Sequence, residues 1–123
     1  MALEHARPGQ PIDISPLGAA LATSATHAIV KTRTLELMRI VLRRGQSIPP
    51  HDVQGELTLQ CIEGAVSVET AGSACELRAG QLILVPARAE HAVRALEDTS
   101  LLLTVQIPPG APGSASSTTH DLP

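Results

Sequence analysis

The chain contains no Phe, Tyr or Trp among its 123 residues. Its core must therefore be filled by Leu, Ile, Val and Ala. No Phe, Tyr or Trp ring is available to stack on a nucleic-acid base or on a sugar. These absences exclude ligand recognition by an aromatic-lined site.

An excess of positive charge is also absent. Nine Lys and Arg residues stand against twelve Asp and Glu, which gives a formal net charge of −3. This balance offers no electrostatic footprint for nucleic acid or an anionic membrane. One apolar run, Leu17 to Ala22, is too short for a secretory segment, and no other run approaches the length of a membrane span. We therefore expect a soluble, cytoplasmic protein that binds neither nucleic acid nor membrane.

Cysteine is scarce, with Cys61 and Cys75 alone. They fall in two different predicted strands, without C-x-x-C spacing and without a histidine cluster nearby, so neither a redox pair nor a zinc knuckle is indicated. We expect two buried, reduced thiols that act as small apolar residues.

Short segments of alternating or aliphatic residues fill most of the chain. Glycine and proline turns separate them, and no amphipathic helix stands out. The predicted strands cover residues 28–30, 34–42, 57–62, 65–70, 74–78, 82–85, 92–96 and 101–107. Residues 17–25 are predicted as a short helical turn or as an Ala-rich segment across one end of the domain. This pattern predicts one all-β sandwich or barrel.

Both ends of the chain differ in composition from the middle. Residues 1–11 are rich in Pro, Gly and charge, and residues 108–123 have too little apolar content to offset the entropy of ordering. We therefore predict a flexible N-terminal arm over residues 1–11, a barrel over 12–107 and a disordered tail over 108–123.

Two glycine-led units each deliver one histidine. In the first, Gly45 precedes His51 with five residues between them, and two prolines force an extended backbone just before the histidine. In the second, Gly80 leads an apolar strand to Pro86, and His91 follows five residues later. The two units place two imidazoles at comparable strand ends.

The spacing of these residues resembles the two motifs of the cupin family, G-x5-H-x-H-x3-E-x6-G and G-x5-P-x-G-x2-H-x3-N. The glycine, proline and histidine positions match, with Gly64 closing the first motif. The resemblance covers about residues 12–107 and implies the double-stranded β-helix, or jelly-roll barrel, of the small cupins. Residue by residue, His51 and His91 carry over as metal ligands.

Four motif positions depart from the family pattern. Val53 replaces the second histidine of the first motif and Leu57 replaces its glutamate, while Arg88 and Ala95 replace the glycine and asparagine of the second. Half of the family's metal ligands are therefore missing. Glu56, one residue before the family's glutamate position, becomes a third ligand only if a bulge turns its side chain inward.

The resemblance implies two classes of function. One is a binding protein that holds a small, mostly apolar molecule in the barrel, with a divalent transition metal (Fe, Mn, Ni or Zn) held weakly at His51 and His91. The alternative is a metal-dependent oxygenase or isomerase acting on a small organic substrate, with Glu56 as third ligand or acid/base group. Strand periodicity predicts the pocket lining, which is Val53, Leu57, Leu59 and Cys61.

A homodimer is also predicted. Residues 34–42 are apolar on both sides of the expected strand, and small cupins typically pack one sheet against a second subunit. The predicted partners are therefore a second copy of the chain and a small-molecule ligand.

Overall fold

The computed structural model describes residues 5–109 of the chain. These residues form one short 3-10 helix and nine strands: η1 (Gly18–Thr23), β1 (His27–Lys31), β2 (Leu35–Leu42), β3 (Ser47–His51), β4 (Leu57–Glu63), β5 (Ala65–Thr70), β6 (Ser73–Arg78), β7 (Leu82–Val85), β8 (His91–Ala95) and β9 (Thr99–Gln106). The predicted all-β class is confirmed, and η1 falls on the predicted helical turn. Most of the predicted tail, residues 110–123, lies outside the described residues, as do residues 1–4.

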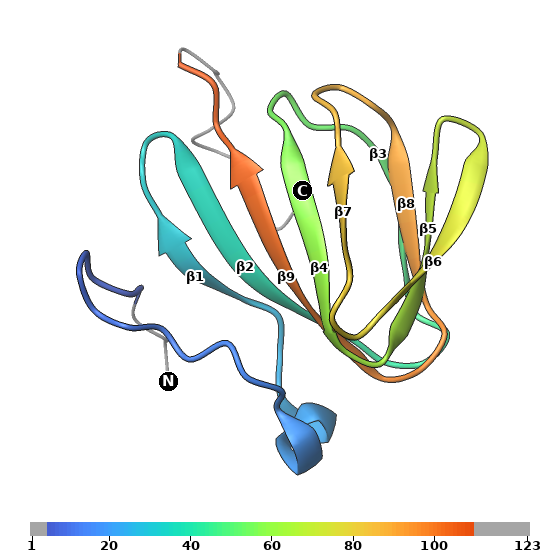
Figure 1. Ribbon diagram of the computed structural model, residues 1–123, viewed down its shortest axis with the longest axis horizontal. Helices are drawn as coiled ribbons and strands as arrows, with labels where there is room; N and C mark the ends of the chain where they lie inside the picture. Colours follow the sequence, from blue (N-terminus) through green and yellow to red (C-terminus); the bar gives the residue numbers. More distant parts are fainter. Residues whose placement is uncertain (1–4, 110–123) are drawn as a thin grey trace.

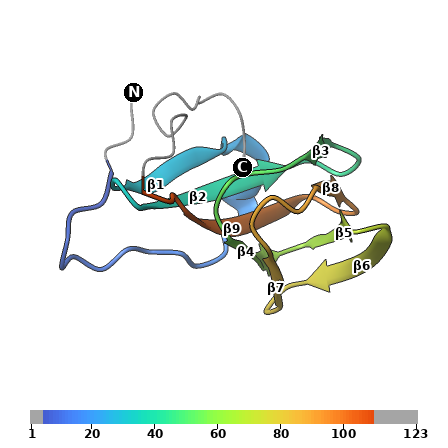
Figure 2. The same ribbon diagram turned by 90° about the horizontal axis from the view of Figure 1, so that it is seen from above.

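The strands form two antiparallel sheets (Figure 1). The larger sheet has the order β1-β2-β9-β4-β7, and the smaller has the order β3-β8-β5-β6. Figure 2 shows the same sheets from above, with β1 and β2 far from β5 and β6. Neighbouring strands in each sheet are mostly distant in sequence, as in the predicted double-stranded β-helix.

The core lies between the two sheets and is entirely aliphatic apart from sulfur-containing residues. Alternate residues of the larger sheet face inward because successive side chains of a strand point to opposite sides. The larger sheet contributes Met38, Ile40, Leu42, Leu57, Leu59, Cys61, Val85, Leu101, Leu103 and Val105, and the smaller sheet contributes Ile48, Val66, Val68, Leu77, Val93 and Ala95. In the absence of aromatic residues, closely packed side chains, mostly Leu, Ile and Val, fill the core.

Strand β3 was expected only as an extended approach to His51. It pairs with β8, but its register shifts between Ile48 and His51, where Pro49 and Pro50 lie. Proline cannot donate a ladder hydrogen bond, so it is confined to edge strands and bulges. Strand β3 is an edge strand, and the irregularity accommodates both prolines.

The two cysteines differ in their surroundings. Cys61 is fully buried, and burial raises the pKa of its thiol despite a hydrogen bond to the Glu63 carbonyl. Cys75 is exposed on β6, so the expectation that both thiols are buried is wrong for Cys75. Strand β6 is the edge of the smaller sheet, and five of its six residues are exposed.

No helix within residues 5–109 is long and apolar enough to cross a membrane.

A carboxylate on the larger sheet holds the segment before β1. Glu63 accepts hydrogen bonds from the backbone N–H groups of Leu17 and Gly18, at 2.8 and 3.1 Å, and from the Ser100 hydroxyl. Burial alone would raise the pKa of Glu63, but these hydrogen bonds, with the Arg39 guanidinium nearby, together lower it below its ordinary value of 4.5. The start of η1 is therefore attached to the sheet through an ionised side chain.

Protonation of Glu63 should weaken this attachment. Because the folded-state pKa lies below the unfolded value, the stabilisation is present above about pH 4.5 and is lost as the pH falls through the folded-state pKa. We expect Glu63→Gln to lower the free energy of unfolding at pH 7 by about 1–3 kcal/mol, and by much less at pH 3. Urea unfolding at both pH values measures this difference. The exposed Glu69→Gln serves as the control, and an equal effect of both changes at pH 7 would contradict the prediction.

Candidate functional site

The two histidines predicted as ligands are direct cross-strand partners. His51 is the last residue of β3 and His91 is the first of β8, and the register pairs them. Their ring centroids lie 4.5 Å apart, with the ring planes tilted by 51°. His91 is 3% exposed and His51 is half-buried. The fold thus brings together two imidazoles that are 40 residues apart in sequence.

Both rings are oriented by the same local hydrogen bond. Nδ1 of His51 lies 3.0 Å from the carbonyl oxygen of Pro49, and Nδ1 of His91 lies 3.1 Å from that of Ala89. A carbonyl oxygen only accepts, so Nδ1 carries the proton and donates in each ring. In a neutral imidazole this leaves a lone pair on Nε2, the arrangement found in metal-ligating histidines.

The two Nε2 atoms are buried and have no hydrogen-bond partner. A buried polar atom without a partner costs about 1–3 kcal/mol, so two of them in neighbouring rings indicate a place where a polar ligand or cation binds. The donor set fits a transition metal, since imidazole suits Zn, Cu, Fe and Ni. His51 and His91 would supply two of its ligands.

The structure does not bring Glu56 into this pair. Glu56 is exposed, and its backbone is hydrogen-bonded to Gln106 through both its N–H and its carbonyl. Within residues 5–109 no three His, Cys, Asp or Glu side chains lie close enough to hold a metal ion. Among the described residues, the His51–His91 pair is thus not joined by a third side chain of these types.

The loops that precede β4 and β8 are tied to each other beside the histidine pair. The Arg88 N–H donates to the Val53 carbonyl at 2.8 Å. Arg88 has a φ of 64°, the left-handed conformation that favours glycine. At the glycine position of the second cupin motif, an arginine thus adopts a conformation that favours glycine.

The four residues predicted to line a pocket differ in their distance from the histidines. Val53 follows His51 by two residues and packs half-buried against the core, and Leu57 begins β4 at 2% exposure. Cys61 lies four residues further along β4, a rise of about 13 Å, and its Sγ contacts the carbonyls of Glu63 and Gly64. Val53 and Leu57 are thus the members of the set that the chain places toward the histidine end.

Sequence reasoning missed the groups that orient the rings. The carbonyls of Pro49 and Ala89 each lie two residues before a histidine. A backbone carbonyl has no side-chain signature, so residue type could not reveal either one. Two signals in the sequence bear on the course of the backbone before the histidines. Both carbonyls belong to the residue two positions before a histidine, and a pair of prolines directly precedes His51.

The family model described as "Cupin domain" matches residues 38–107 of the chain. This match spans more than half of the 123 residues. The chain therefore belongs to the cupin domain family, and the resemblance inferred from the two motifs is confirmed. No curated protein matches the sequence significantly.

Solved structures agree with this assignment at the level of fold. A cupin superfamily protein from Desulfitobacterium hafniense has a TM-score of 0.70 at 17% identity, and the match covers 84% of this chain and 100% of that one. A conserved protein of unknown function from Streptococcus pyogenes has a TM-score of 0.69 at 21% identity, covering 89% and 100%. A mutant salicylate 1,2-dioxygenase from Pseudoaminobacter salicylatoxidans has a TM-score of 0.65 at 22% identity, covering 76% of this chain but 28% of that one. At these identities the likeness concerns the fold alone.

Proposed function

We propose that this cupin binds a small molecule next to a divalent transition metal held weakly by His51 and His91. The observation that carries the proposal is the pair of buried, unpartnered Nε2 atoms on rings 4.5 Å apart. Two protein donors leave most of the coordination sphere open. A small molecule with chelating oxygen or nitrogen atoms would complete it, and the metal would act as a Lewis acid toward that molecule.

The surroundings favour a ligand with an apolar body. Val53 and Leu57 are the side chains of the predicted pocket set nearest to the histidines along the chain, and both pack with the core. No charged residue in this part of the chain joins the histidines as a third metal donor within residues 5–109. We therefore expect a ligand whose polar atoms gather at one end, toward the imidazoles.

Metal binding to tag-free protein tests the proposal. We expect Ni²⁺ or Zn²⁺ to bind with one-to-one stoichiometry, and His51→Ala or His91→Ala to lower the affinity at least about tenfold, because loss of supporting groups around a metal already costs 10–100-fold. Isothermal titration calorimetry and the metal-induced rise in Tm are the measurements.

His27→Ala is the matched control for these substitutions. Nδ1 of His27 also lies close to the carbonyl two residues earlier, that of Ala25, at 2.9 Å, but His27 is on β1 in the other sheet. Its substitution should leave the affinity unchanged. Equal losses for all three variants, or none for His51→Ala and His91→Ala, would reject the proposal.

A metal-dependent enzyme is the second candidate. It is favoured by the open coordination positions that a two-histidine site leaves for a substrate. Oxygen uptake or isomerisation by the metal-loaded protein, lost in His91→Ala and kept in His27→Ala, would support catalysis. Stoichiometric binding of small chelating acids without turnover would support the binding protein.

A further inference from the structure

A row of polar residues crosses the inner side of the smaller sheet at its histidine end. The register pairs His51 with His91, His91 with Thr70, and Thr70 with Ser73. Directly paired residues project to the same side of a sheet. That side is the inner one, because Val68, two residues before Thr70 on β5, is buried in the core. The row therefore places two hydroxyl groups beside the two imidazoles.

A tight hairpin fixes the position of Thr70 in this row. The turn between β5 and β6 consists of Ala71 and Gly72, with φ values of 49° and 82°. Positive φ at both central residues is the conformation of a two-residue hairpin loop, which sets the register of its two strands. Cβ atoms of directly opposite residues lie about 5 Å apart. Thr70 is thus one strand spacing from His91, on the same side of the sheet.

The two hydroxyl groups of the row differ in whether they are available to a ligand. The Ser73 hydroxyl donates to the Thr70 carbonyl at 3.3 Å, and Ser73 is exposed. Thr70 is half-buried, and its own hydroxyl makes no hydrogen bond within residues 5–109. Thr70 is therefore the member of the row whose hydroxyl can bind a molecule held at the histidines.

The charge of the histidine pair favours an anionic ligand. With its proton on Nδ1 and its Nε2 bound to a metal, each imidazole is neutral. The two rings therefore do not offset the charge of a divalent cation, which becomes the largest local charge. A carboxylate would offset this charge, and a hydroxyl group can donate a hydrogen bond to it. Such a charge-assisted bond is roughly twice as strong as a neutral one.

We propose that Thr70 is a specificity-determining residue, and that the ligand it selects is a carboxylic acid with an oxygen atom on the neighbouring carbon. This inference rests on the proposed function, because it assigns the chemical class of the molecule bound at His51 and His91. The carboxylate and the neighbouring oxygen are the donor atoms for the metal, and the Thr70 hydroxyl donates to the carboxylate. The apolar chain of the acid extends toward Val53 and Leu57.

Calorimetric titration of the zinc-loaded full chain with the hydroxy acid α-hydroxyisocaproate tests this assignment. Thr70→Val removes the hydroxyl and keeps the size and branching of the side chain. We expect it to lower the affinity for the acid at least about tenfold, since the lost hydrogen bond is to a charged group. The affinity for Zn²⁺ alone should stay unchanged. Thr70→Ser retains the hydroxyl and should keep most of the affinity for the acid.

Thr104→Val is the matched control for Thr70→Val. Thr104 is also half-buried, but it lies on β9 in the larger sheet and alternates with the core residues Leu103 and Val105, so it points away from the core. Its substitution should leave the affinity for the acid unchanged. Zinc binding with equal affinities for the acid in Thr70→Val and Thr104→Val would overturn this inference alone. Failure of the wild type to bind zinc would reject the proposed function, and the inference with it.

A third imidazole tests the placement of Thr70 with the metal alone. Thr70→His should raise the affinity for Zn²⁺ at least about tenfold, because it adds a nitrogen donor directly opposite His91 on the same side of the sheet. Thr104→His adds the same group on the other sheet and should give no gain. A gain in Thr70→His alone supports the placement of Thr70 beside the site. Equal affinities of the two variants for Zn²⁺ would overturn it.

Discussion

Gly64→Ala is expected to lower the free energy of unfolding by roughly 3–5 kcal/mol, a large part of the stability of a single domain. Gly64 has a φ of 85°, a conformation that costs an L-residue about 1–2 kcal/mol. A Cβ at this position would also lie 2.3 Å from the Asp98 carbonyl oxygen and 2.4 Å from Oγ1 of Thr99. The backbone atom cannot move aside as a flexible side-chain end would.

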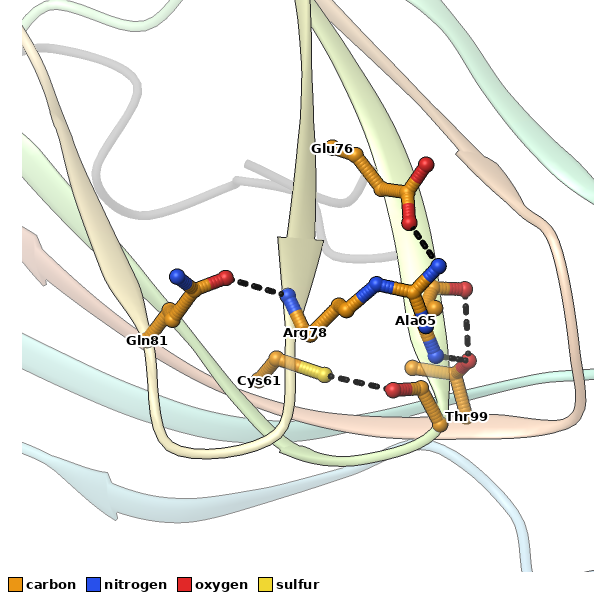
Figure 3. A network of polar contacts seen from close by, with 7 residues as sticks. Cys61, Ala65, Glu76, Arg78, Gln81 and Thr99 are labelled. Carbon is orange, nitrogen blue, oxygen red and sulfur yellow. Dashed lines mark hydrogen bonds and ion pairs between the residues drawn. The ribbon is translucent and has the colours of Figure 1, made fainter.

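The Thr99 hydroxyl, which this Cβ would contact, already takes part in hydrogen bonds. Its Oγ1 accepts from the Ala65 N–H at 3.1 Å (Figure 3). The same oxygen lies 2.8 Å from the Glu97 carbonyl oxygen. Thr99 is fully buried, so displacing its hydroxyl would leave polar groups of the β4–β5 turn without partners.

Gly80→Ala is the matched control for Gly64→Ala. Gly80 has a φ of 90°, yet a Cβ there would meet no atom within 4 Å. The loss of stability in Gly80→Ala therefore measures only the free-energy cost of a positive φ. The additional loss in Gly64→Ala measures the cost of the contact with Asp98 and Thr99. Urea unfolding monitored by far-ultraviolet circular dichroism gives both values. Equal losses would show that the contact with Asp98 and Thr99 relaxes freely.

The second large effect is expected when the missing family ligands are restored. Val53→His combined with Leu57→Glu would add an imidazole and a carboxylate at the motif positions beside His51 and His91. We expect the affinity for Ni²⁺ or Mn²⁺ to rise by orders of magnitude, because ligand number and type determine affinity at such sites. The apo variant should melt below wild type, since each unpaired polar group buried costs about 1–3 kcal/mol. Added metal should raise its Tm sharply.

Position 59 provides the matched control for this double variant. Val53→His with Leu59→Glu buries the same two polar groups, because Leu59 is 3% exposed on the same side of β4. Its carboxylate would start about 7 Å further along the strand, and the gain in affinity should disappear. Glu56→Gln should leave metal binding by the wild type unchanged, since Glu56 is exposed. A gain at position 59 equal to that at 57 would refute the assumed register.

The features predictable from sequence were those with local causes. Period-two alternation located β2, β4 and β9, since inward residues such as Ile40 and Leu101 must be apolar. The motif spacing located His51, His91 and the turn at Gly64, because a positive φ with no room for a Cβ restricts the residue type. In these cases the local structure restricts the residue type at one position, and that residue is visible in the sequence.

The features that were missed depend on contacts between distant segments. Strand β3 was obscured by its two prolines, and its pairing depends on β8, more than 40 residues later. The Glu63 carboxylate finds its donors in the segment before β1. No local window of sequence holds that information.

The two prolines of β3 interrupt its pairing with β8 just before the two histidines. The ladder between these strands is interrupted between Ile48 and His51, so this edge has fewer backbone hydrogen bonds holding it than a regular pair. A ligand held between the two imidazoles would bridge the strands beyond the interruption and act as a removable cross-link. Amide hydrogen exchange at Ile48 measures how often this edge opens. Slower exchange when ligand is added would then report that the site is occupied.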